Sequence, residues 1–273
     1  MEQILLPTII EFLESDDPNM GKVVITPCHQ GYGTTIGNAL RRVLLSSLPG
    51  AAVESVKIDG VQHEFSALTG VQEDVVEILL NLKQLAVRSF SDAPVKLSLT
   101  KKGVVDIVAA DFDKNADIEI VNPNLKIATL TDKNVEVQME ITIGRGRGYV
   151  PASEKDTRGC DLGTIAIDSL YTPIRDVGYD VEMTRVGDVT DYEKLTVTVA
   201  TNGTLTPKTA IHQAVRILID HFTLLSEVAG DEETSVSSGP MSSADEEITE
   251  GGTVGEEVEE VKKTSKKKKS SKQ

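Results

Sequence analysis

Hydrophobic residues recur with the period of an α-helix in three stretches of the chain. In the first, Thr35 to Leu48, apolar side chains fall at i, i+3, i+4 and i+7, and Pro49 follows directly. A second stretch begins near Gly70, and a third runs from Pro207 to about Val228. We therefore predict three helices, each with an apolar face that packs against another part of the protein.

Between these stretches, β-branched residues and alternating patterns predict strands. Residues 1–13 are apolar and end in an acidic turn, and no element is predicted there. Short strands begin near Val95 and lead into a glycine-rich loop, Ile141 to Pro151. Because helices and strands do not alternate regularly, the sequence predicts an α+β fold. The other predicted strands are Lys22–Pro27, Val53–Ile58, Asp161–Leu170, Tyr179–Thr184 and Leu195–Thr201.

The last predicted helix has a wide apolar face. Two adjacent stripes run along it, each with members alternately four and three residues apart. A face of this width often indicates a second packing partner, and we favour self-association. The alternative is a helix buried deep within its own domain. The first stripe consists of Ile211, Val215, Leu218, Phe222 and Leu225.

Composition limits the functions open to this 273-residue chain. Its net charge is −15, and acidic residues outnumber basic ones in residues 1–230 as well, so strong autonomous binding to duplex DNA is not expected. The lack of tryptophan and an aromatic content of 4% argue against a base-stacking platform. Cys28 and Cys160 form neither a disulfide framework nor a zinc motif. With no signal peptide and no long apolar span, we expect a cytoplasmic protein and no membrane contact.

No local motif points to catalysis or to a bound group. Gly31, Gly33 and Gly37 lie between a strand and a helix, but the lysine and hydroxyl residue of a phosphate-binding loop do not follow. A tight turn that needs glycine explains them better. Alternating acids from Asp111 to Asp117 lack the glycine and glutamate of a calcium loop. We predict no metal, no cofactor and no catalytic residue. The open alternatives are an autonomous nucleic-acid-binding protein and a small-molecule-binding protein.

Two groups of arginines are candidates for contacts with a partner. Arg41 and Arg42 lie with Asn38 on the polar side of the first predicted helix, and arginine suits bidentate contacts with carboxylates at interfaces. An exposed helix face is the alternative. Arg145 and Arg147 lie in the glycine-rich segment, where they could bind phosphate or a partner strand, or pair with acidic residues of the same chain.

Five segments together resemble the α subunit of bacterial-type RNA polymerase. They follow the family's order and spacing, and the resemblance spans roughly residues 4–228. Five separate motifs make a chance resemblance very improbable. The segments are Gly31–Gly50 (GYGTTIGNALRRVLLSSLPG), Ile58–Ser66 (IDGVQHEFS), Gly70–Lys83 (GVQEDVVEILLNLK), Arg145–Ala152 (RGRGYVPA) and Thr201–Thr204 (TNGT).

The resemblance implies a two-part N-terminal domain in a non-catalytic assembly subunit. Residues 1–50 and 175–230 would form a discontinuous dimerisation half, and residues 51–174 a β-rich insertion that contacts the large subunits. The homodimer would recruit the β and β′ subunits, which carry out RNA synthesis. Sigma and omega would join the holoenzyme, and DNA would be contacted through the complex. A bacterial cytoplasm is the simpler location, with a plastid as the alternative.

The resemblance also assigns roles to individual residues. Arg42 matches the second arginine of the family's NALRR motif, which contacts β, and Asn38 and Arg41 lie in the same motif. For contact with the large subunits, it indicates Lys83, Ile167, Asp168, Arg145 and Arg147. For the dimer interface, the two helices would supply Ile36, Leu40, Val43 and Leu44 together with Ile211, Val215, Leu218, Phe222 and Leu225.

The C-terminal region departs from the family pattern. The family usually continues into a second domain that binds upstream promoter DNA and activators. Residues 231–273 have instead an acidic block, a lysine-rich end and no periodic apolar pattern, so we expect a disordered charged tail. A solubilising role is the first interpretation of this tail, and weak non-specific contact with nucleic acid is the alternative.

Overall fold

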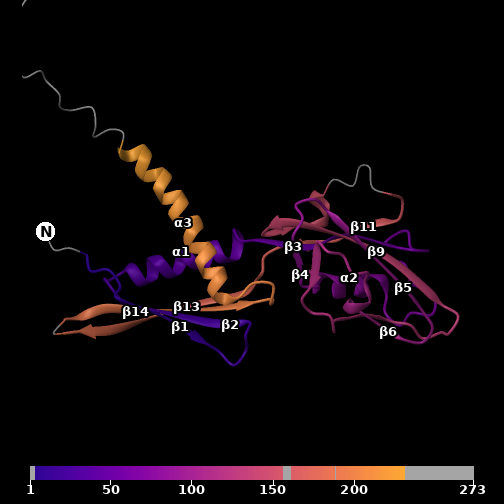
Figure 1. Cartoon of the computed structure of the whole chain (residues 1–273), viewed down its shortest axis with the longest axis horizontal. Coiled ribbons are helices and arrows are strands. Elements are labelled where there is room, and N and C mark those ends of the chain that lie inside the picture. The colour runs from indigo at the N-terminus through magenta and orange to yellow at the C-terminus, as the bar shows by residue number, and fades with distance from the viewer. Residues whose placement is uncertain (1–3, 156–160, 188, 231–273) are drawn as a thin grey trace, which may run out of the picture. The chain divides into compact units, whose positions relative to one another are not determined.

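Strands from both ends of the described chain form one antiparallel sheet in the computed structural model (Figure 1). The structure describes residues 4–155, 161–187 and 189–230, so the expected charged tail lies outside the described residues. Neighbouring strands follow the order β1-β2-β14-β13. Their bounds are β1 (Ile9–Glu14), β2 (Met20–Cys28), β13 (Ile174–Val186) and β14 (Val189–Thr201).

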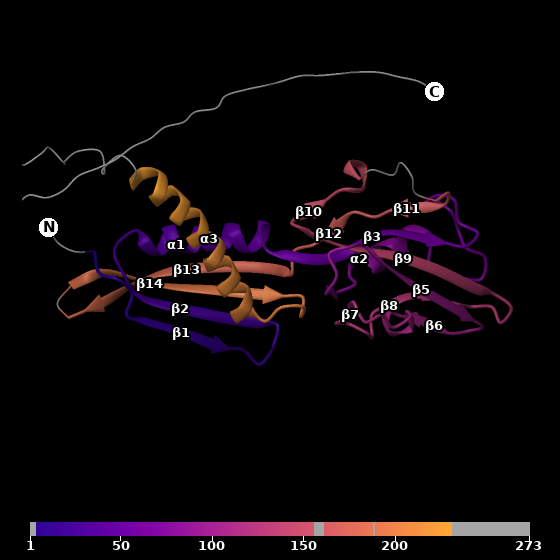
Figure 2. The ribbon, with the colours of Figure 1, turned by 45° about the horizontal axis from the view of Figure 1, so that its top comes forward.

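Two helices cover one face of this sheet, as Figures 1 and 2 both show. They are α1 (Tyr32–Ser46) and α3 (Pro207–Gly230). Leu44 of α1 and Ala214 of α3 are fully buried against sheet residues such as Val197. In α1 and in the first half of α3, the apolar periodicity that predicted the helices therefore corresponds to residues that pack on the sheet.

A six-stranded sheet is built from the middle of the chain, with strand order β5-β9-β3-β4-β7 and β11 paired to β3. Two smaller antiparallel pairs join β6 to β8 and β10 to β12. The strands of the large sheet are β3 (Pro49–Ile58), β4 (Val87–Ser89), β5 (Val95–Lys102), β7 (Ile118–Ile120), β9 (Glu136–Arg147) and β11 (Thr164–Ala166). The pairs are β6 (Asp106–Val108), β8 (Lys126–Thr129), β10 (Tyr149–Val150) and β12 (Ser169–Leu170).

One helix, α2 (Val75–Lys83), packs into the core of this second sheet. Ile78 and Leu82 have no exposed surface, and they belong to the same buried cluster as Ile141 and Ile143 of β9. Short 3-10 turns occupy Ala109–Asp111 and Ala152–Glu154. The α+β prediction is confirmed by this mixture of two sheets and a few helices.

Helix α2 begins at Val75, and the predicted start near Gly70 is wrong. The backbone of the preceding residues pairs instead with the end of β8, since Gln72 N–H donates to the Thr129 carbonyl over 3.0 Å. Val71 also forms an isolated bridge with Leu130. The Gly70 carbonyl accepts a hydrogen bond from the Thr131 N–H over 2.9 Å, so a tertiary pairing occupies an acceptor that an earlier helix start would need.

The glycine-rich segment around Arg145 is also not a loop. It is the end of β9, and it pairs with the start of β3 at Gly50 and Gly146. A Cβ at Gly146 would lie 2.8 Å from the Tyr171 ring, and one at Gly144 would collide with the Glu54 carboxylate. These glycines leave space for neighbouring side chains and do not turn the chain.

Candidate partner-binding surfaces

Across residues 4–155, 161–187 and 189–230, no group of three or more His, Cys, Asp or Glu could hold a metal ion. The same residues include no helix long and apolar enough to cross a membrane. The features that remain to be explained are exposed side chains of kinds that bind other proteins.

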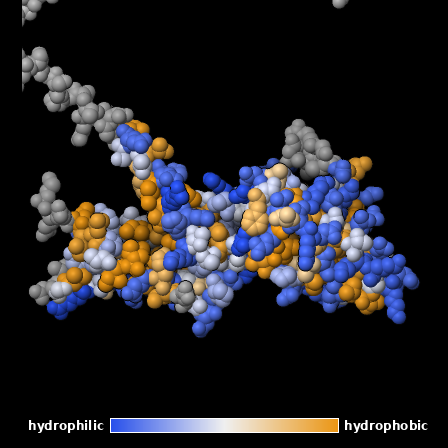
Figure 3. Space-filling model, viewed as in Figure 1, coloured by the Kyte–Doolittle hydropathy of each residue, from blue (hydrophilic) through white to orange (hydrophobic). Residues whose placement is uncertain are grey.

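Of the two long helices, α3 has more exposed apolar side chains than α1, and most of them lie in its outer half, residues 219–228. Residues 219–228 are all exposed, and Phe222, Leu225 and Val228 retain 62%, 64% and 75% of their accessible surface. Figures 1 and 2 show this part of α3 extending beyond the sheet, and Figure 3 shows hydrophobic residues along it. Exposed apolar side chains gathered on one element are typical of a protein–protein contact.

The residues expected at the dimer interface fall into two groups. Leu40, Leu44 and Ile211 are buried in the core between the helices and their own sheet. The second group keeps surface available to a partner. Val215, Phe222 and Leu225 are exposed, while Ile36, Val43 and Leu218 are half-buried.

The three candidate residues of the NALRR motif, Asn38, Arg41 and Arg42, differ in their exposure on α1. Asn38 and Arg42 are exposed and lie four residues apart, which places them on one face of the helix. Arg41 is half-buried, and its guanidinium donates a hydrogen bond to the backbone carbonyl of Val177 in β13. Arg41 therefore attaches α1 to its own sheet, and Asn38 and Arg42 stay accessible.

Lys83 and Asp168 meet although they are 85 residues apart in the sequence. The Lys83 ammonium lies 2.7 Å from Asp168 Oδ2, and the N–H of Ala152 donates to Oδ1 over 2.8 Å. Hydrogen bonds from Lys83 and then from Ala152 lower the pKa of Asp168 below its usual range. Ile167, expected beside them, is only 3% exposed, so its side chain belongs to the core.

Exposed apolar side chains accompany this ion pair. Val76 and Leu80 lie about two turns and one turn before Lys83, the last residue of α2, and they are 39% and 52% exposed. On the neighbouring strands, Tyr149 of β10 pairs with Leu170 of β12, and these residues are 57% and 55% exposed. We call these four residues, with Lys83 and Asp168, the α2–β12 surface.

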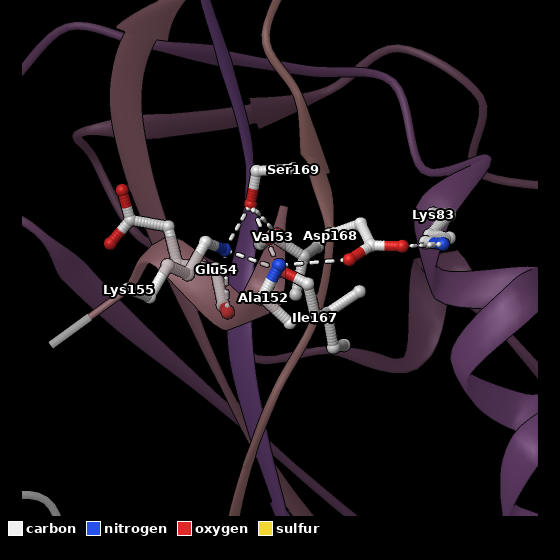
Figure 4. A network of polar contacts seen from close by, with 8 residues as sticks. All are labelled: Val53, Glu54, Lys83, Ala152, Lys155, Ile167, Asp168 and Ser169. Atoms are coloured by element: carbon white, nitrogen blue, oxygen red, sulfur yellow. Dashed lines mark hydrogen bonds and ion pairs between the residues drawn. The ribbon is translucent and has the colours of Figure 1, made fainter. Parts of the chain in front are cut away.

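A half-buried lysine next to this surface, Lys155, was not predicted from the sequence. Lys155 Nζ donates to the carbonyl oxygens of Glu54 and Ile167 and to Ser169 Oγ, which lies 2.5 Å away (Figure 4). Ser169 Oγ in turn donates to the Val53 carbonyl over 2.6 Å. Burial lowers the pKa of Lys155. No spacing rule could have found this residue, because its acceptors come from distant strands.

Arg145 and Arg147, at the end of β9, differ in whether they pair with an acidic residue. Arg145 forms an ion pair with Asp92, so an acidic residue of the same chain is its partner. Arg147 is exposed and forms no ion pair within the described residues. Of the alternatives left open by the sequence, the intramolecular one therefore applies to Arg145.

Comparison with known proteins identifies close relatives. Residues 56–172 match the family model described as the RNA polymerase Rpb3/RpoA insert domain. The chain is 51% identical over 225 residues to the DNA-directed RNA polymerase subunit alpha of Symbiobacterium thermophilum. The aligned region covers 82% of this chain and 71% of the relative. The subunit alpha of Clostridium botulinum is 46% identical over 239 residues, covering 86% and 76%. That of Clostridium kluyveri is 50% identical over 216 residues, covering 79% and 68%.

Proposed function

Because the chain belongs to the family of bacterial DNA-directed RNA polymerase α subunits, we propose that it is a non-catalytic assembly subunit which forms a homodimer and recruits β and β′. Nucleotidyl transfer is then an activity of the assembled complex. Sigma and omega complete the holoenzyme, and DNA is contacted through the other subunits. The bacterial cytoplasm is the compartment that this proposal implies.

The observation that carries the proposal is the exposed outer half of α3. A helix that leaves Phe222 and Leu225 more than 60% exposed is costly in water unless another surface covers it. We assign residues 1–50 and 175–230 to a dimerisation half on this basis. Its interface consists of Ile36, Val43, Val215, Leu218, Phe222 and Leu225, whereas Leu40, Leu44 and Ile211 complete the core of each protomer.

Contact with β is assigned to the exposed pair on α1. Asn38 and Arg42 combine an amide with a guanidinium on one helix face, and neither makes a side-chain hydrogen bond within the described residues. A guanidinium with free donors suits a carboxylate of a partner protein. Arg41 contributes indirectly, by holding α1 on β13.

Contact with a large subunit is also assigned to the insertion, residues 51–174. The α2–β12 surface combines apolar side chains with one ion pair, as the centre of a protein interface usually does. Its support is the meeting of Lys83 and Asp168 over 2.7 Å, which brings together two residues that the family resemblance had indicated separately. Arg147 adds an exposed positive charge at the end of β9.

Light scattering of the full chain, alone and then with the β subunit of the same polymerase, tests the proposal. We expect a dimer alone and a complex of two α chains with one β chain. A monomer that ignores β would overturn the assembly role.

Arg42→Ala separates the two proposed faces of the helix. We expect this variant to remain dimeric while its affinity for β falls about tenfold or more, because one charge-assisted hydrogen bond is worth about 1.5–3 kcal/mol. Titration of the purified dimer with β measures the affinity. Arg175→Ala is the matched control, since it removes an equally exposed arginine from β13 of the same half. Dissociation of the dimer by Arg42→Ala would show that the faces are assigned wrongly.

A further inference from the structure

The N-terminus of α1 is capped by Glu193 of β14, a residue far from the helix in the sequence. No side chain near the start of the helix forms a cap hydrogen bond. Instead, both carboxylate oxygens of Glu193 accept backbone N–H groups, from Gly31 over 2.9 Å and from Gly33 over 2.8 Å. The first N–H groups of a helix have no partners within the helix and carry its positive dipole end, so a carboxylate there is strongly favoured.

Glu193 reaches this position because of its place in β14. It pairs with Cys28 of β2, and a register shift separates it from the next pair, Leu195 with Ile25. Its side chain is only 6% exposed, and no lysine or arginine of the described residues forms an ion pair with it. A buried carboxylate needs hydrogen bonds or an opposite charge to compensate for its removal from water. Here the backbone N–H groups at the start of α1 supply the hydrogen bonds.

Each of the three glycines rejected above as a phosphate loop has a structural reason, and for Gly31 and Gly33 that reason lies in the contact with Glu193. Gly31 has φ of +83°, a conformation that side chains rarely adopt. A Cβ at Gly33 would lie 2.7 Å from Glu193 Oε2. A Cβ at Gly37 would lie 2.7 Å from the Tyr179 ring, where α1 rests on β13. The segment has the geometry of an anion site at a helix N-terminus, and the chain's own carboxylate fills it.

We propose that Glu193 is a positioning residue which seats α1 on the sheet and thereby sets the orientation of Asn38 and Arg42 toward a partner. Two attachments fix the helix: Glu193 holds its first turn, and Arg41 holds its middle through the Val177 carbonyl. Asn38 and Arg42 lie just beyond the first attachment and beside the second. The seating of the helix stands on these contacts alone, whereas its effect on a partner rests on the proposed function.

Chemical rescue of the full-length Glu193→Ala variant tests this proposal. We expect its melting temperature to fall by roughly 5 °C or more, because two charge-assisted hydrogen bonds are lost and two N–H groups are left without an acceptor. Sodium formate, a carboxylate small enough for the space left by the side chain, should recover part of that loss when compared with sodium chloride at equal ionic strength. Wild type should respond equally to the two salts. Affinity for β should fall with Glu193→Ala and recover with formate, while the dimer mass stays unchanged.

Glu182→Ala is the control variant, because Glu182 is an exposed glutamate of the neighbouring strand that pairs with Lys194. It should show no difference between formate and chloride. An equal response of Glu193→Ala to both salts would overturn the proposal that the Glu193 carboxylate holds the first turn of α1. Unchanged β affinity in Glu193→Ala, in a preparation where Arg42→Ala does weaken β binding, would overturn the positioning role. If Arg42→Ala also leaves β affinity unchanged while formate still stabilises Glu193→Ala, the proposed β contact fails and the role of Glu193 in holding α1 stands.

Glu193→Gln serves if the alanine variant does not fold. Glutamine keeps the size of the side chain and one acceptor oxygen, but it turns an NH₂ group toward a backbone N–H. We expect a smaller fall in melting temperature and a weaker affinity for β. Wild-type values for both quantities would overturn the proposal.

Discussion

The two sheets of this protein complete their hydrophobic cores in different ways. Around the six-stranded sheet, one buried cluster has 25 members among the described residues, including four from α2. Around the four-stranded sheet, the buried cluster has 13 residues, and the outer half of α3 contributes none of them. The first region thus buries most of its helix within the protomer, although its α2–β12 surface stays exposed. The second has apolar surface left over, which is the condition for a stable contact with another copy.

Polar groups show the same difference. In the six-stranded region, Lys155, Ser169 and Tyr171 are bonded to neighbouring strands, so their polarity stabilises the insertion itself. On α1, Asn38 and Arg42 remain without such partners. Satisfied polar groups fix a shape, whereas exposed ones are available to bind. The polar groups of these three residues are therefore used within the insertion, whereas those of Asn38 and Arg42 are available to the partner proposed for them.

Phe222→Asp should break the dimer and is the largest effect that we expect. A symmetric interface receives two buried charges, and each unpaired charge costs about 3 kcal/mol or more. The dissociation constant should therefore rise by at least about ten-thousandfold, and light scattering should give a monomer. The fold should persist, because Phe222 is 62% exposed in the protomer and the charge remains in water there.

Phe65→Asp is the control, since Phe65 is 80% exposed but belongs to the insertion. It should leave the dimer mass unchanged. A Phe222→Asp protein that stays dimeric would mean that the outer half of α3 is not the interface. The contrast between the two regions would then have to be drawn from other surfaces.

Paired leucine truncations sharpen the contrast in stability. Leu82→Ala removes a side chain with no exposed surface, so the free energy of unfolding should fall by about 3 kcal/mol at every protein concentration. Leu225→Ala, at a position 64% exposed, should cost about 1–2 kcal/mol, and only where the dimer is populated. Urea denaturation at several protein concentrations distinguishes them. A concentration-independent loss for Leu225→Ala would place that residue in the core of its own protomer.

The sequence predicted those elements whose apolar pattern matches their burial. Helix α1 and the first half of α3 follow this rule, because a stripe every three or four residues faces the sheet. Strand β1 was not predicted, because Ile9, Ile10, Phe12 and Leu13 leave no alternation to recognise. Its conformation comes from pairing with β2, for example Ile10 with Ile25, which is information from another segment.

The candidate surfaces were predicted only in part, for a similar reason. The family resemblance, now confirmed, indicated Lys83 and Asp168, but their ion pair joins two segments that no local pattern connects. The sequence interpretation rejected nucleotide binding at Gly31 and Gly33 on the missing lysine, yet it could not find Glu193, which lies 160 residues from Gly33. Residues that act through tertiary contacts carry no signal in spacing alone.

Tyr171→Phe should have the smallest effect, and its pH dependence tests the internal bonding of the insertion. Burial, and then a 2.7 Å hydrogen bond to Glu54, raises the pKa of Tyr171 to about 12. The folded pKa exceeds the unfolded value of about 10, so the stabilisation is complete below about pH 10 and disappears as the pH rises toward 12. We expect wild type to exceed Tyr171→Phe by about 1–2 kcal/mol at pH 8, and this difference to shrink between pH 10 and 12. Tyr32→Phe, at a 42% exposed position on α1, should show no such window, because water already solvates that hydroxyl. A constant difference for Tyr171→Phe across this range would mean that its hydroxyl is not bonded as a neutral donor, and the insertion would lose one of the polar contacts assigned to its own stability.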